Sequence, residues 1–257
     1  MHPLRNLLFA ALLATPVAAA FAQTAIDQNR ALAGSVTPGD APGFPVTLSQ
    51  PGSYKLTGNL TVPMGATAIV IAANGVTLDL NGFTVSGPSS CTRDQNSGAV
   101  SCSYQASDSV SIGIDASEAR GTTVRNGKIQ GFGGPGVRAG MGDHYEGLRL
   151  AENRWGLFST AGGGGAGAGA LVERCTLELN QLHGLYMFVG LVNHSRALHN
   201  GSSGFAGPGP RLTVADSQAI GNRVYGLTSV SARGSFTDTA VYSVTSMGGN
   251  LRNGTPF

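Results

Sequence analysis

The sequence predicts an all-β fold, a right-handed parallel β-helix in which each coil adds one short strand to each of three sheets, with a short N-terminal cap. A template recurs along the chain: an apolar residue, a second apolar residue five positions later, and a glycine seven positions after that. Repetition with a period of roughly 20 to 27 residues is the signature of a solenoid, whose units bury their apolar faces by stacking. The 257 residues include 39 glycines and only 12% charged residues, which suits short, closely stacked strands.

The template occurs five times in full and a sixth time with one residue missing. The full copies are Val124/Ile129/Gly136, Val172/Leu177/Gly184, Val192/Ala197/Gly204, Val214/Ala219/Gly226 and Phe236/Val241/Gly248, and the short copy is Tyr145/Leu150/Gly156. Leucine-rich and helical repeats are the rival solenoids. Both fit poorly, because the chain lacks the Leu-x-x-Leu-x-Leu-x-x-Asn core and the Ala-, Glu-, Lys- and Leu-rich runs that they require. We expect about seven or eight coils from the period.

Residues 1–22 have the layout of a signal peptide. Arg5 precedes the apolar stretch Leu7 to Ala14, and the small-x-small ending Ala20-Phe21-Ala22 predicts cleavage before Gln23. The apolar stretch is shorter than the roughly 20 residues of a membrane-spanning helix, and nothing later in the chain is longer. We therefore expect an exported protein, secreted or periplasmic, without membrane insertion.

Residues 23–65 are expected to form the cap and the first extended segments, and residues 66–257 the β-helix. A modest helical pattern over residues 26–36 suits a cap over the first coil. The strongest strand signal lies in residues 68–87, where apolar residues alternate with small or polar ones. Asn74-Gly75 and Asn81-Gly82 mark the bends between these strands.

The three cysteines predict one disulfide and one remaining thiol. Cys91 and Cys102 bracket a polar, turn-rich segment, so we expect them to close an insertion loop at residues 88–108. Cys175 lies inside a repeat unit, and we expect it to be buried there as a small hydrophobic residue.

Two polar positions recur within the repeats. Bends are expected at Asn126-Gly127, Arg174-Cys175, His194-Ser195, Asp216-Ser217 and Asp238-Thr239. An asparagine follows the second apolar position by three residues in four units, at Asn153, Asn180, Asn200 and Asn222. Stacked asparagines form hydrogen bonds along a solenoid, so we interpret this row as structural.

The units VERCTLELNQLHGLYM and VADSQAIGNRVYGLTS resemble the right-handed parallel β-helix repeats of the pectin-lyase-like superfamily. The entry segment PGSYKLTGNLTVP also resembles the leading coils of exported bacterial β-helix proteins. That superfamily includes polysaccharide lyases, glycoside hydrolases, epimerases, phage tailspikes and non-catalytic adhesins. The resemblance implies the fold, but fold alone does not settle function.

Stacking places the residues around each repeat glycine in rows. The first outward row, just before the glycine, holds Pro135, Trp155, His183, Ser203 and Tyr225. The second outward row, two residues after the glycine, holds Arg138, Phe158, Tyr186, Ala206 and Thr228. Aromatic rings stack on sugar faces and arginine pairs with uronate carboxylates, so these rows predict a polysaccharide-binding surface with Trp155, Phe158 and Tyr225 as binding residues. Alternatively, the Gly-rich loop Ala161 to Ala170 covers some of these rings.

If this surface is catalytic, a metal-independent lyase is the reaction that fits it. β-Elimination requires a base, an acid and a group that neutralises the uronate carboxylate. His183 and Tyr186 would share the first two roles, and Arg138 or Arg154 would serve the third. We expect no metal and no cofactor, because the carboxylates are scattered and a calcium site needs several oxygen ligands close together. A glycosidase fits less well, since no carboxylate pair accompanies the aromatic rows.

The alternative function is a non-catalytic structural or adhesive β-helix at the cell envelope. We expect no nucleic-acid partner under either hypothesis, because the chain has 16 basic and 14 acidic residues with no block of like charge. An enzyme would gather its His, Tyr and Arg side chains in a groove, whereas an adhesin would expose its rings on an open face.

Overall fold

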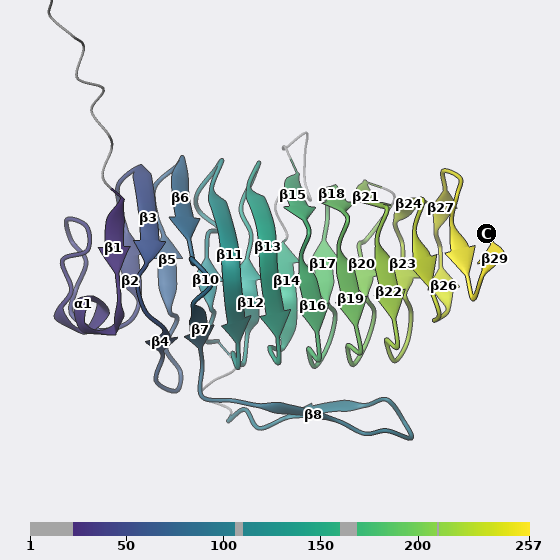
Figure 1. Ribbon diagram of the computed structural model, residues 1–257, viewed down its shortest axis with the longest axis horizontal. Coiled ribbons are helices and arrows are strands. Elements are labelled where there is room, and N and C mark those ends of the chain that lie inside the picture. Colours follow the sequence, from purple (N-terminus) through teal and green to yellow (C-terminus); the bar gives the residue numbers. More distant parts are fainter. Residues whose placement is uncertain (1–22, 106–109, 160–168, 210) are drawn as a thin grey trace, which may run out of the picture.

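The computed structural model describes residues 23–105, 110–159, 169–209 and 211–257. The predicted signal peptide lies outside these ranges. Within them the chain winds into a parallel β-helix, with its successive coils stacked along one long axis (Figure 1). Helix α1 (Gln28–Ala33) lies at the N-terminal end of the stack, as expected for a cap. Asp27 caps this helix by accepting the Arg30 N–H at 2.8 Å.

The strands form three faces. The first face contains β1 (Thr24–Ile26), β3 (Gly52–Leu56), β6 (Val76–Asp79), β11 (Thr123–Gln130), β13 (His144–Ala151), β15 (Ala170–Glu173), β18 (Gly190–Asn193), β21 (Leu212–Ala215), β24 (Ser231–Arg233) and β27 (Thr245–Ser246). The second face contains β4 (Leu60–Thr61), β7 (Thr84–Ser86), the C-terminal halves of β11 and β13, then β16 (Thr176–Glu178), β19 (Arg196–Leu198), β22 (Gln218–Ile220), β25 (Phe236–Thr237) and β28 (Leu251–Arg252). The third face contains β2 (Val46–Leu48), β5 (Ile69–Ile71), β10 (Ile114–Asp115), β12 (Pro135–Arg138), β14 (Trp155–Ser159), β17 (Leu185–Met187), β20 (Phe205–Ala206), β23 (Leu227–Thr228) and β26 (Val241–Tyr242).

The long strands β11 and β13 join the first two faces. Both run unbroken through the corner, so these faces form one 18-stranded sheet, whereas the third face is a separate nine-stranded sheet. The predicted three-sheet β-helix is thus confirmed. Parallel pairing already begins at β1 and β2, ahead of residue 66, and the third face has more strands than the seven or eight coils expected. At the other end, β29 (Thr255–Pro256) pairs antiparallel with β28.

The strand register confirms the template for all copies except the last. Val124, Tyr145, Val172, Val192 and Val214 lie in one column, and all are fully buried. That column continues to Ala232, not to Phe236. Phe236 instead pairs with Gln218 on the outside of the second face, and Val241 belongs to the third face. The prediction failed there because Ala232 follows Val214 by 18 residues, whereas Val214 follows Val192 by 22.

The predicted asparagine row is confirmed as a buried ladder. Asn153, Asn180, Asn200 and Asn222 are at most 3% exposed. Asn200 shows the pattern: its Oδ1 accepts the Asn180 N–H at 3.1 Å and its Nδ2 donates to the Leu177 carbonyl at 3.0 Å. The ladder also explains the repeat glycine, since a Cβ at Gly184 would lie 2.7 Å from the Gly204 carbonyl and 2.9 Å from the Asn200 amide.

In the middle coils, the corner between the first and second faces holds a residue with left-handed backbone conformation. Asn126, Arg174, His194 and Asp216 adopt φ values between 47° and 60°, as predicted for bends. The next residue in this row is Gly234, with φ of 57°, and not Asp238. Asp238 and Thr239 do lie in a bend, but it follows β25, so the predicted place of Asp238 in the same row as Asp216 is wrong, for the same reason that the last template copy failed.

The insertion is an antiparallel hairpin of β8 (Cys91–Arg93) and β9 (Val100–Cys102), which runs along the axis beside the coils (Figure 1). The predicted Cys91–Cys102 disulfide closes it. Cys175 is a buried free thiol, as expected, and burial raises its pKa to about 12. No helix in the described ranges is long and apolar enough to span a membrane.

Candidate functional site

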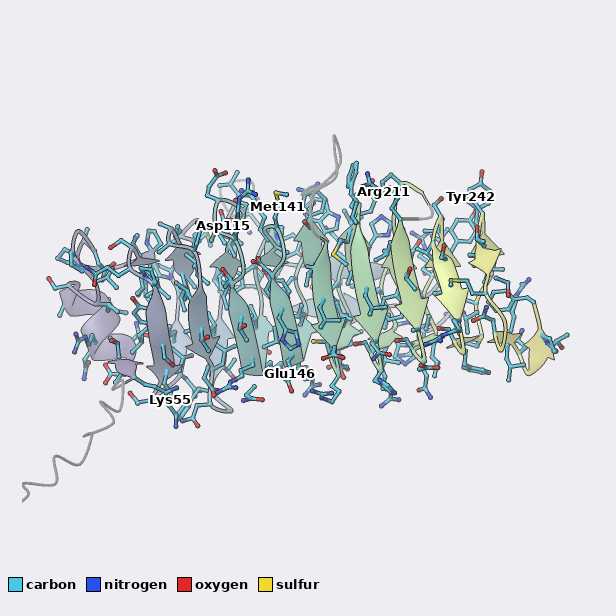
Figure 2. The ribbon with its side chains drawn as sticks, turned by 90° about the horizontal axis from the view of Figure 1, so that it is seen from above. Lys55, Asp115, Met141, Glu146, Arg211 and Tyr242 are labelled. Carbon is cyan, nitrogen blue, oxygen red and sulfur yellow. A yellow bond between two sulfur atoms is a disulfide. The ribbon has the colours of Figure 1, made fainter. Side chains whose placement is uncertain are left out.

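The third face carries both outward rows. Val137, Leu157, Leu185, Phe205 and Leu227 form a continuous column with at most 1% exposure, so the next residue of each strand, in the second outward row, points outward. The first row lies just ahead of this column, in β12, in β14 and in the turns before β17, β20 and β23. The second outward row extends beyond its predicted members to Asp115 and Tyr242. These two residues lie on the same side of the solenoid, opposite Lys55 and Glu146 of the first face (Figure 2).

Five rings form one contiguous cluster on this face. Its members, here called the aromatic patch, are Trp155, Phe158, His183, Tyr186 and Phe188, and all are partly buried. Phe158 and Tyr186 stack with their ring centres 5.7 Å apart and their planes at 15°. Trp155 lies 5.5 Å from Phe158, and His183 lies 5.7 Å from Tyr186. Phe188 meets the edge of Tyr186 at 5.9 Å.

The sequence identified four of these rings but missed Phe188. This residue follows the end of β17, beyond the positions that the repeat template covers. The signal for it was the run Tyr186-Met187-Phe188, in which residues on either side of a buried methionine point the same way.

Tyr225 is not part of the aromatic patch. It packs against Tyr242 with ring centres 5.5 Å apart, and forms a second, smaller aromatic cluster toward the C-terminal end. Ser203 and Ala206 occupy the intervening coil in the two rows and are at most 2% exposed. The predicted single aromatic surface is thus divided in two. Tyr242 was missed because the last template copy was out of register.

The two predicted arginines occupy different places. The Arg154 guanidinium lies over Trp155, 4.7 Å from the ring centre, which is a cation–π contact. Arg138 pairs with Asp115 at 3.4 Å in the second outward row. Phe158 separates Arg138 from Tyr186, and two strand spacings of about 4.8 Å put them roughly 10 Å apart. The structure therefore brings together His183, Tyr186 and the rings, with Arg154 at their edge, and places Arg138 away from the His183–Tyr186 pair.

His183 is held as a neutral hydrogen-bond donor. Burial lowers its pKa from the usual 6.5. Its Nδ1 accepts the Ser203 N–H at 3.3 Å, so the proton of the neutral ring resides on Nε2. In this tautomer neither ring nitrogen is free to accept a proton from a substrate. The geometry thus suits donation of a hydrogen bond to a hydroxyl better than general-base catalysis.

The described residues include no group of three or more His, Cys, Asp or Glu side chains arranged to hold a metal ion. The Gly-rich loop Ala161 to Ala170, the alternative cover for the rings, falls outside the described residues except at Gly169 and Ala170.

No family model matches this chain, and no curated protein matches it. Among solved structures, the Dettilon tailspike protein gp208 is similar, with a TM-score of 0.41 and 13% sequence identity. The alignment covers 76% of this chain and 45% of the tailspike chain, so the match spans less than half of that protein. At this identity the likeness concerns the fold alone.

Proposed function

We propose that this protein is an exported β-helix that binds an extracellular polysaccharide at the aromatic patch, without cleaving it. The observation that carries the proposal is the contiguity of five rings on the outer side of one sheet, with the Arg154 guanidinium at their edge. Rings offer apolar surface to the C–H faces of sugars, and the Nε2–H of His183 and the guanidinium offer donors to hydroxyl groups.

Binding without cleavage is favoured by the state of His183 and the place of Arg138. A lyase needs a free base beside the uronate carbon and a cation at its carboxylate. His183 has committed Nδ1 to the Ser203 N–H, and Arg138 is paired with Asp115. β-Elimination would then rest on Tyr186 and Arg154, because Arg138 is paired with Asp115 and lies two strands from Tyr186.

Export is supported by the signal-like residues 1–22 and by the Cys91–Cys102 disulfide, which suits an oxidising compartment. An exported protein would meet extracellular polysaccharides in that compartment.

Tryptophan fluorescence tests the proposal directly, because Trp155 is the single tryptophan of the chain. Titration with pectate, alginate, hyaluronan and neutral glucans should change the emission for at least one polymer and saturate. Because Trp155 lies within the aromatic patch, a change in its emission reports a change at that surface. If no polymer changes the emission, the proposal fails.

The lyase hypothesis is tested in the same samples. Unsaturated uronate products absorb in the ultraviolet, and we expect no rise in absorbance while the emission change is present. A rise that survives a chelator and disappears in Tyr186→Phe would instead establish metal-independent cleavage.

A structural or adhesive role is the second candidate, and the stacking of Phe158 on Tyr186 across adjacent coils favours it. Under that hypothesis the rings hold coils together, and their removal lowers stability with no polysaccharide affinity to lose. Measurement of both quantities in Tyr186→Ala separates the two candidates.

A further inference from the structure

The disulfide-closed hairpin is fastened along the corner between the second and third faces. Near its base, the Cys91 N–H donates to Glu152 Oε2 at 3.1 Å. Further along, Val100 packs against Gly201 so closely that a Cβ there would lie 3.1 Å from the Val100 Cβ. Arg93 donates to the Gly221 carbonyl at 3.5 Å. The hairpin therefore spans several coils beside the first outward row.

A polar cleft of about 260 Å³ lies between the hairpin tip and the coils. Its lining residues are Arg93, Gln95, Asn96, Ser97, Gly98, Gly221, Asn222, Arg223, Asp238 and Thr239. None of these side chains is apolar, and neither outward row contributes a ring. The cleft is thus a site distinct from the aromatic patch, with chemistry suited to a polar or charged group.

The two arginines of the cleft have spare hydrogen-bond donors. A guanidinium carries five N–H groups. Arg93 makes the one long contact to Gly221 within the described ranges, and its Nε is buried without a partner. Arg223 is exposed, and in the same ranges it forms no ion pair within 4.0 Å.

The one carboxylate of the cleft is already engaged. Asp238 Oδ1 accepts the Gly221 N–H at 2.8 Å and the Thr239 hydroxyl at 2.8 Å. Asp94, which follows Arg93 in the hairpin, is likewise engaged, because its Oδ1 accepts the Ser97 N–H at 2.6 Å and the Ser97 hydroxyl at 2.8 Å. The two carboxylates nearest the arginines are therefore both hydrogen-bonded to neighbouring groups. Within the described ranges neither arginine forms an ion pair, so both keep guanidinium donors that a ligand oxyanion can engage.

We propose that this cleft binds an oxyanion, a carboxylate or sulfate ester carried by the polysaccharide held at the aromatic patch and its C-terminal neighbours. Arginine binds such groups through paired, charge-assisted hydrogen bonds. Arg223 and Tyr225 are two residues apart, at most about 7 Å along the chain, so the cleft adjoins the second aromatic cluster. Tyr225 in turn lies two coils beyond His183 of the patch, roughly 10 Å away, so one polymer can reach from the patch to the cleft. This inference rests on the proposed polysaccharide binding and adds a preference for acidic chains.

Calorimetric titration with inorganic sulfate and with matched acidic and neutral oligosaccharides tests the inference. Arg93→Gln and Arg223→Gln should each weaken the acidic oligosaccharide about tenfold, the equivalent of one lost charge-assisted contact, and leave the neutral one unchanged. Arg196→Gln, an exposed arginine on the second face, is the matched control and should change neither. Sulfate should bind more weakly than the acidic oligosaccharide and should compete with it.

Two results would overturn the inference. One is an acidic preference that survives in both Arg93→Gln and Arg223→Gln, or that falls equally in Arg196→Gln. The other is free sulfate that binds as tightly as the oligosaccharide, since the cleft would then serve a free ion. Failure of the proposed function is recognised separately, because Trp155→Ala would then leave the affinities for both oligosaccharides unchanged.

Discussion

The asparagine ladder and the aromatic patch both arise because stacking aligns equivalent residues of successive coils. They differ in whether their polar groups find hydrogen-bond partners within the protein. The ladder amides are buried and hydrogen-bonded to the next coil and to backbone carbonyls. The rings of the patch are partly exposed, and among the described residues no acceptor pairs with His183 Nε2 or Arg154 Nε. In a solenoid, repetition alone therefore does not identify function. The row whose rings and hydrogen-bond donors remain available at the surface is the candidate for ligand binding.

The largest effect should come from breaking the ladder. Asn200→Ala removes the acceptor for the backbone and side-chain N–H groups of Asn180 and the side-chain donor to the Leu177 carbonyl. Buried polar groups left without partners cost about 1 to 3 kcal/mol each, so we expect a loss of about 3 to 5 kcal/mol in urea unfolding. Asn193→Ala is the matched control: its one side-chain contact, to Glu173 at 3.4 Å, is partly exposed, and we expect a loss below about 1 kcal/mol. Equal losses in the two variants would contradict the structural reading of the ladder.

The patch should behave in the opposite way, with affinity affected more than stability. Tyr186→Ala removes the ring that touches Phe158, His183 and Phe188, and we expect polysaccharide affinity to fall about tenfold. Tyr186→Phe keeps the ring and should retain affinity within about twofold. Direct titration of both variants checks this. If the phenylalanine variant binds as weakly as the alanine variant, the hydroxyl rather than ring stacking carries recognition.

A smaller effect should appear in the pH dependence of stability. Because burial lowers the pKa of His183 in the folded state, its contribution is fully present above the unfolded value of 6.5 and is lost as pH falls through the lowered folded value. Stability of the wild type should therefore decline more than that of His183→Gln between roughly pH 8 and pH 5. Parallel curves for the two proteins would show that the imidazole is not desolvated.

The smallest effect should come from the charged first face. Arg174 pairs with Glu146 at the surface, which lowers the pKa of that carboxyl through the guanidinium contact. Exposed ion pairs contribute about 0 to 1 kcal/mol, so Arg174→Gln should change the unfolding midpoint little, and less still in high salt. A large loss would mean that the charged rows also hold coils together.

Much of this fold follows from periodicity, and the errors have physical causes. The columns through Val124 and Ile129 and the asparagine ladder were predictable, because stacking demands the same residue type at the same position. The last coils were not predictable, because one coil there is four residues shorter than the one before it. Ala232 and Thr237 therefore occupy the buried columns, although the sequence pattern favoured Phe236 as the apolar residue.

The candidate site was only partly predictable. Rows of rings could be read from the register, but their division into two clusters depends on which neighbours pack together. The role of Arg93 could not be predicted from the sequence. Arg93 lies beside Gly221 only because the hairpin, which is distant in sequence, packs along the coils.

The most direct test of the account compares two ring deletions on different faces. Trp155→Ala removes a ring of the patch, and Phe236→Ala removes a partly exposed ring from the second face. Affinity for the polymer that changes Trp155 emission, measured by calorimetry on folded protein, should fall about tenfold or more in Trp155→Ala and remain within about twofold in Phe236→Ala. Unchanged affinity in Trp155→Ala, or an equal loss in both variants, would contradict the assignment of the aromatic patch as the polysaccharide-binding site.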